Sequence, residues 1–205
     1  MRKIRHIPVL AAALLVLCLD AALPTTAQAP ATASLAGQLL VASPSIGDPR
    51  FAGTVILMVR HDKDGAFGIV VNRPIGERPL AAILEIIGEK DATVAGTVRI
   101  FAGGPVQPEI GFVIHGGDYH GPGTIEINAR VAVTANREIL RDIGHGKGPA
   151  QSLIAFGYAG WAPGQLEGEL ARRDWAIAPG EPKLIFDEDR DKVWDAAYAR
   201  RMQDL

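Results

Sequence analysis

The hydrophobic pattern is most pronounced in residues 44–74, where two apolar runs flank a polar turn. Residues 54–59 are β-branched or aliphatic and contain no helix breaker, which is the composition of a strand buried on most of its surface. Asp64-Gly65 favours the positive φ values of a hairpin turn, and residues 66–71 return as a second buried strand. We predict a hairpin that later segments must cover, because an isolated hairpin is marginally stable in water.

Shorter apolar runs predict the remaining strands. These runs are residues 38–42, 98–102, 111–115, 124–128, 130–133, 152–156, 174–178 and 183–186. Residues 157–160 (GYAG) are expected to turn sharply out of the run that ends at residue 156, because two glycines permit a close bend.

Helical spacing appears in four segments between these runs. They are residues 80–88 after Pro79, residues 135–143 with Thr134 as the expected N-cap, a helix that begins at Pro163, and a last helix capped by Asp187 or Asp189. Strands therefore outnumber helices, and the helices are scattered among them. This order predicts an α+β fold with a mixed, mostly antiparallel sheet.

The first 29 residues have the pattern of a secretory signal peptide. A basic start is followed by an apolar run over residues 9–19, and Ala27-Gln28-Ala29 supplies small residues for cleavage. The run is shorter than the ~20 residues of a membrane span. An uncleaved N-terminal anchor is the alternative. Residues 30–36 are then expected to be a linker and residues 37–205 a single domain.

Cleavage after Ala29 would change both the cysteine content and the charge. The chain has one cysteine, Cys18, inside the predicted signal peptide, so disulfides and cysteine metal sites are excluded from the mature protein. The mature chain would carry 18 Lys and Arg against 22 Asp and Glu. This acidic balance argues against nonspecific nucleic-acid binding, which uses clustered basic residues.

Two histidine-carboxylate groups could bind a metal ion. The first is His61, Asp62 and Asp64 in the hairpin turn, and the second is the H-x-x-D-x-H spacing of residues 115–120. The turn lacks the further ligands of an EF-hand loop, and the second group has no helix or strand to fix its ligands. We therefore expect a solvated turn, a glycine-rich loop and no metal or cofactor.

No other motif carries a catalytic signature. No serine lies in a G-x-S-x-G elbow, and the Gly103-Gly104 and Gly116-Gly117 loops match no nucleotide fingerprint. Tyr158 and Trp161 combine an apolar body with a polar tip, which suits either a ligand cleft or packing of the turn onto the hairpin.

Four blocks of the chain resemble the AlgH/YqgE family of bacterial proteins. They are residues 44–74, GGPV at 103–106, GFVIH at 111–115 and GYAGWAPGQLEGEL at 157–170, supported by Trp175 and Phe186-Asp187. The resemblance implies an α+β fold whose curved sheet forms an incomplete barrel with helices packed outside. The family has no established biochemical activity and its members are often labelled transcriptional regulators, so the resemblance supplies no catalytic residues.

Three functions follow as hypotheses. The first is a non-catalytic binding or regulatory module with an unknown protein or small-molecule partner; the alternatives are a transcriptional regulator and a metal-dependent hydrolase. For the first, we expect the exposed parts of the family blocks to form one site beside a groove. Its residues would be Asn72, Arg73, Pro74, Gly104, Tyr158, Trp161 and Gln165. Cleavage of residues 1–29 would export the protein, whereas family members are usually cytosolic.

Overall fold

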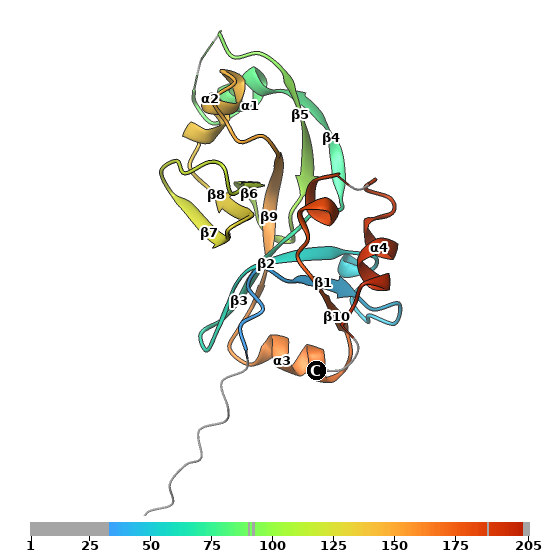
Figure 1. Cartoon of the computed structure of the whole chain (residues 1–205). Coiled ribbons are helices and arrows are strands. Elements are labelled where there is room, and N and C mark those ends of the chain that lie inside the picture. Colours follow the sequence, from blue (N-terminus) through green and yellow to red (C-terminus); the bar gives the residue numbers. More distant parts are fainter. Residues whose placement is uncertain (1–32, 90, 92, 188, 203–205) are drawn as a thin grey trace, which may run out of the picture. The chain divides into compact units, whose positions relative to one another are not determined.

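The structure, a computed structural model, describes residues 33–89, 91, 93–187 and 189–202. The predicted signal peptide and residues 30–32 of the predicted linker lie outside these described residues. The described strands form one sheet in the order β10-β1-β2-β3-β9-β6-β8-β7, and β5 joins it at β9 and carries β4 (Figure 1). The strands are β1 Leu39–Ala42, β2 Val55–Asp62, β3 Gly65–Val70, β4 Pro74–Pro79, β5 Thr97–Ala102, β6 Val106–Gly116, β7 Thr124–Asn128, β8 Val131–Thr134, β9 Ser152–Trp161 and β10 Trp175–Ala178.

Helices alternate with these strands along the chain. They are a 3-10 turn, Pro49–Phe51, the α-helices α1 Leu80–Ile86, α2 Glu138–Gly144, α3 Gln165–Ala171 and α4 Val193–Ala199, and a π-helix, Lys183–Asp187. Neighbouring strands are antiparallel except for β5 and β9, which are parallel. The sheet does not close into a barrel. The predicted α+β class with a mixed, mostly antiparallel sheet is therefore confirmed.

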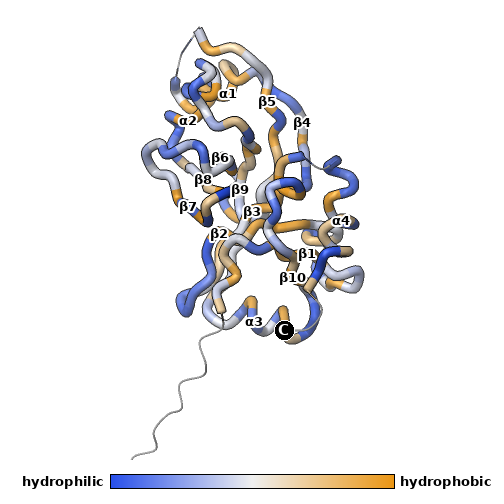
Figure 2. Tube along the Cα trace, in the orientation of Figure 1, coloured by the Kyte–Doolittle hydropathy of each residue, from blue (hydrophilic) through white to orange (hydrophobic). Residues whose placement is uncertain are grey.

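The central strands are buried on both faces, which explains their nearly unbroken apolar runs. Because side chains alternate along a strand, Val55, Leu57 and Val59 of β2 point to one hydrophobic cluster while Ile56 and Met58 point to another. Figure 2 shows the same hairpin with hydrophobic strands and a hydrophilic tip. The hairpin of residues 44–74 is thus the centre of the core.

Helices cover both faces of the sheet. Leu166 of α3 packs on the face of β1, β2 and β3 that carries Ile56. The π-helix and α4 pack on the opposite face, through Leu184, Ile185 and Val193. Farther along the sheet, α1 and α2 together cover the strands β5, β6 and β9. No helix among the described residues is long and apolar enough to cross a membrane.

Strand β9 changes neighbours in its middle, and Gly104 and Gly157 make the change possible. Residues 152–156 lie between β5 and β6, whereas Ala159 and Trp161 pair with β3. At the switch, a Cβ on Gly104 would overlap the backbone of Tyr158, and a Cβ on Gly157 would overlap the Gly104 carbonyl. The prediction of a sharp turn at residues 157–160 is therefore wrong, since β9 continues through these residues to Trp161. The small glycines instead allow the loop that contains Gly104 to pack closely against the strand.

Three further elements differ from their predictions. Strand β4 was not expected, because it is a charged edge strand that begins and ends with proline. The apolar residues 183–186 form a π-helix rather than a strand, with Leu184 and Ile185 buried. Thr134 ends β8 instead of capping α2, because its hydroxyl bonds to His115 and to Thr124.

The last helix also begins differently. Its N-cap is Lys192, without a side-chain capping bond, so neither Asp187 nor Asp189 caps α4. Asp189 instead accepts a hydrogen bond from the backbone N–H of Asp191, in the turn before the helix.

Candidate functional site

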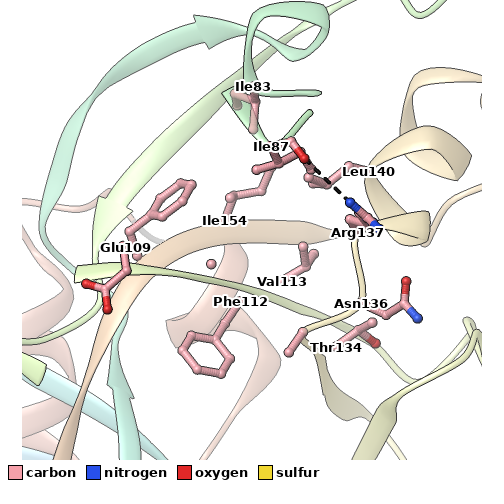
Figure 3. Close-up of a pocket in the computed structure, with 13 residues that line it drawn as sticks. Ile83, Ile87, Glu109, Phe112, Val113, Thr134, Asn136, Arg137, Leu140 and Ile154 are labelled. Atoms are coloured by element: carbon pink, nitrogen blue, oxygen red, sulfur yellow. Dashed lines mark hydrogen bonds between the residues drawn. The ribbon is translucent and has the colours of Figure 1, made fainter. Parts of the chain in front are cut away.

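A pocket of about 370 Å³ lies between helices α1 and α2 and the strands β6 and β9 (Figure 3). Most of its lining is apolar. The lining residues are Ile83, Ile87, Glu109, Gly111, Phe112, Val113, Thr134, Ala135, Asn136, Arg137, Leu140, Ile154 and Phe156. Small-molecule sites typically have this combination of an apolar surface and a few polar groups.

Paired residues of two strands build the floor. Val113 of β6 lies opposite Ile154 of β9, and Gly111 lies opposite Phe156. A Cβ on Gly111 would stand 3.2 Å from the Phe156 ring, so the glycine leaves room for that ring. Phe156 is only half-buried, and the floor therefore presents aromatic surface to the pocket.

The helices supply the apolar walls. Ile83 of α1 and Leu140 of α2 are buried in the cluster that joins both helices to the sheet. Ile87, at the end of α1, remains half-buried at the edge of the pocket. These residues belong to the helical faces that the sequence indicated, but their spacing alone did not reveal a space between the helices and the sheet.

Arg137 joins the end of α1 to the start of α2. Its Nη1 donates to the Ile87 carbonyl over 3.5 Å, and its Nε lies 3.1 Å from Oε1 of Glu89. Glu89 also accepts a hydrogen bond from Arg141, and this bond, with the charges of Arg141 and Arg137, lowers the pKa of Glu89. The arginine side chain stays 60% exposed at the pocket rim.

Glu109 approaches the pocket from a bulge in β6. Val106 pairs with Tyr158, and the next pair is Gly111 with Phe156. The chain advances five residues along β6 but only two along β9 between these pairs, so β6 contains three extra residues that protrude. Gln107 within this bulge has φ +46°, a left-handed conformation that is unfavourable for a side chain with a Cβ. Bulges and strained residues of this kind occur frequently beside functional sites.

The histidine of the hairpin turn points away from the neighbouring carboxylates. The buried His61 ring accepts the Leu35 N–H at Nδ1 over 3.2 Å and contacts Glu167 Oε1 through Nε2 at 2.9 Å. Asp62 instead accepts the backbone N–H of Asp64. These residues hold the N-terminal segment, the turn and α3 together rather than converging on one point.

The second histidine group is also dispersed. His115 is fully buried, donates from Nδ1 to the Gly116 carbonyl and lies 2.9 Å from the Thr134 hydroxyl through Nε2. Burial lowers the pKa of His115, and the imidazole is therefore neutral near pH 7. Asp118 accepts the Ala150 N–H, while His120 contacts Glu126. No three potential metal ligands gather among the described residues.

Two of the first three predicted binding residues, Asn72 and Arg73, stabilise the loop of residues 50–55. The Asn72 amide accepts the Val55 N–H over 2.8 Å and donates to the loop, and the Arg73 guanidinium donates to two of its carbonyls. Pro74 begins the edge strand β4 and is exposed. This group follows the last residue of β3.

The other four predicted residues fall into two places. Gly104 packs against the backbone of Tyr158 at the switch of β9. Trp161 pairs with Ala66 at the opposite end of β3 from Arg73, and both Trp161 and Gln165 donate to Glu169. None of the seven residues lines the pocket between α1, α2, β6 and β9.

Comparison with known proteins gives consistent matches over most of the chain. The sequence model of the family described as "DUF179: AlgH-like" matches residues 39–205. A UPF0301 protein of Sphingopyxis alaskensis is 47% identical over 80% of this chain and 87% of its own length. A second UPF0301 protein, from Methylococcus capsulatus, is 43% identical over 80% of this chain and 90% of its own length.

Two solved structures share the fold. The solution structure of the AlgH protein from Pseudomonas aeruginosa superposes with a TM-score of 0.70 and 38% identity, covering 82% of this chain and 89% of that one. A crystal structure of a Corynebacterium diphtheriae protein superposes with a TM-score of 0.64 and 23% identity, covering 82% and 87% of the two chains. At that identity, the second match concerns the fold alone.

Proposed function

The chain belongs to the AlgH-like family, and we propose that it is a binding module without catalytic activity whose ligand occupies the pocket between α1, α2, β6 and β9. The observation that carries this proposal is the apolar floor and walls, to which the half-buried Phe156 and Ile87 contribute surface accessible to a ligand. Burying such surface is the main favourable contribution to binding an apolar group.

The size and polar rim of the pocket support a small ligand or a single protruding side chain. A volume of about 370 Å³ lies at the lower end of the ~300–1,000 Å³ that ligand sites usually have. Asn136 and Arg137 place hydrogen-bonding groups at one edge, where they can orient the ligand. A regulatory role would be exercised through this ligand rather than through DNA, since the net charge of the whole chain is −2.

Filling the pocket tests the proposal. Ala135 is exposed and lines the pocket, so Ala135→Trp should block the site without disturbing the core. Ala81 of α1 is also exposed but lies outside the lining, and Ala81→Trp is the matched control. The probe is N-phenyl-1-naphthylamine, an uncharged aromatic amine whose fluorescence rises in apolar surroundings.

We expect the full-length wild-type chain and the control variant Ala81→Trp each to bind one probe molecule in a saturable manner. Ala135→Trp should weaken binding at least about tenfold, because the indole occupies the space that the probe needs. Thermal unfolding of each variant verifies that it is folded. Absence of saturable binding to the wild type, or equal binding by a folded Ala135→Trp variant, would refute the proposal.

A further inference from the structure

We propose that the ligand of this pocket is zwitterionic, with an apolar body between an ammonium group that binds Glu109 and a carboxylate that binds Arg137. An apolar dipeptide with free ends has this chemistry. The inference rests on the proposed function and adds the identity of the two polar ends. It follows from three observations: where Glu109 and Arg137 lie in the pocket, which hydrogen bonds and ion pairs they make, and how the backbone around Glu109 is held.

Only two of the thirteen lining residues are charged, and their charges are opposite. Figure 3 shows Glu109 on one side of the apolar floor and Arg137 on the other, with Val113 and Ile154 between them. No hydrogen bond or ion pair joins Glu109 to Arg137 or to another part of the described chain. The carboxylate is exposed and can therefore accept a cation from the ligand.

The opposite side of the pocket can bind an anion. Arg137 uses Nε toward Glu89 and Nη1 toward Ile87, and no hydrogen bond within the described chain uses its Nη2. Asn136 accepts the Glu138 N–H through Oδ1, which leaves its Nδ2 as a donor beside the arginine. A guanidinium with a neighbouring amide suits the two oxygens of a carboxylate.

The backbone around Glu109 supports the assignment of a binding role to this residue. A regular strand would need no extra residues between Val106 and Gly111, yet the chain adds three and holds Gln107 at φ +46°. Pro108 adjoins Glu109 and fixes its own φ, which restricts the bulge further. The strain is localised at the residues that bring the carboxylate to the rim, as is typical of preorganised sites.

The apolar floor defines the middle of the ligand. A molecule that spans the distance from Glu109 to Arg137 must cross the floor that Val113 and Ile154 build, and polar atoms there would lose their water without gaining partners. The ligand is therefore charged at its ends and apolar between them. Free amino acids with a small side chain would leave most of this surface uncovered.

Three versions of one peptide separate the two ends. The probes are Leu-Phe with free ends, its N-acetyl form, which lacks the ammonium group, and its C-terminal amide, which lacks the carboxylate. Binding to the full-length chain is measured by titration calorimetry. We expect the free dipeptide to bind about tenfold more tightly than either modified form, because each modification removes one charge-assisted contact.

Variants of the protein then assign each end. With Glu109→Gln, acetylation should no longer weaken binding, whereas amidation still should. With Arg137→Gln, the pattern should reverse. Glu89→Gln is the control for Arg137, because it removes the ion pair with Glu89 and leaves the arginine charge in the pocket. That variant should retain the preference for a free carboxylate.

The outcomes distinguish this inference from the proposed function. If N-phenyl-1-naphthylamine binds in the pocket but the three peptides bind equally or not at all, the zwitterionic ligand is refuted and the apolar site stands. If Ala135→Trp does not affect the aromatic probe, the proposed function itself fails. Preference for 8-aminooctanoic acid over Leu-Phe, with the same response to the variants, would identify an ω-amino acid as the source of the same chemistry.

Discussion

Trp161 and Trp175 lie edge to face, with ring centroids 6.1 Å apart, and donate their indole N–H groups to the same carboxylate oxygen of Glu169. The two bonds are 2.7 and 2.8 Å long. Because the tryptophans belong to β9 and β10, which are not neighbours in the sheet, Glu169 of α3 ties two separate strands together. The family block of residues 157–170 thus has a clear structural role.

Removing this carboxylate should destabilise the fold. Glu169→Ala leaves two buried indole N–H groups without an acceptor, and we expect a loss of about 2–4 kcal/mol in the free energy of unfolding. Glu169→Gln keeps one carbonyl oxygen and should lose about half as much. Urea unfolding followed by tryptophan fluorescence measures both, with the exposed Glu109→Gln as control. A Glu169→Ala variant as stable as the control would contradict this role.

Position 104 requires glycine, because the backbone there packs directly against the backbone of β9. Its φ is +154°, and a Cβ there would overlap the backbone of Tyr158. Gly104→Ala should therefore lower the free energy of unfolding by about 3 kcal/mol or more, or prevent folding. Gly47→Ala is the matched control, because no atom lies within 4 Å of its Cβ position. Comparable melting temperatures for the two variants would show that the strand can move to admit a methyl group.

His115 should make the stability of the protein dependent on pH. Burial lowers its pKa in the folded state below the ordinary 6.5, so the unfolded chain binds the proton first as the pH falls. Stability should then be lost below about pH 6.5, by at most about 1.4 kcal/mol per pH unit, until the lowered pKa is reached.

The His115→Gln variant isolates this contribution. Its amide oxygen can still accept from the Thr134 hydroxyl, but it cannot be protonated. Free energies of unfolding measured from pH 5 to 8 should decline less steeply toward acid in the variant than in the wild type. Parallel curves for the two proteins would show that His115 is protonated equally in the folded and unfolded states.

Leu35 should contribute to stability although it lies in the segment expected to be a linker. Its side chain is 7% exposed and packs with Trp161 and Leu40, and its N–H donates to His61. Leu35→Ala should cost about 2–3 kcal/mol. Ile86→Ala is the control, since Ile86 is 83% exposed. Chemical unfolding of both variants decides the question, and equal stabilities would mean that this segment acts as a linker.

The sequence predicted the buried strands well because both faces of the central sheet are covered. Residues 55–59 are apolar without interruption, and such a run can be recognised without knowledge of its partners. The edge strand β4 was missed for the opposite reason, since its prolines and charges are those of a loop. The run of residues 183–186 was misassigned because four apolar residues fit a helical turn as well as a strand.

The candidate site was not predictable from local patterns. Glu109 and Arg137 lie 28 positions apart in a sequence that contains many charged residues, and neither belongs to a motif. The signal that could have drawn attention was Gln107-Pro108 inside an apolar strand, where proline indicates a bulge. The hydroxyl and aromatic groups that did attract attention, such as Tyr158, proved to pack against Phe67 and Phe112.

The change of neighbours in β9 has a consequence for the order of events during synthesis. This strand supplies the pairing partner of β3, β5 and β6, yet its last residue, Trp161, is translated long after all three. Until the ribosome has released it, the hairpin of residues 44–74 has only β1 beside it, and one of its edges stays unpaired. These pairings between segments distant in the sequence should make folding slow for the size of the domain, with an interval in which an apolar edge is available to chaperones or to a second unfinished chain.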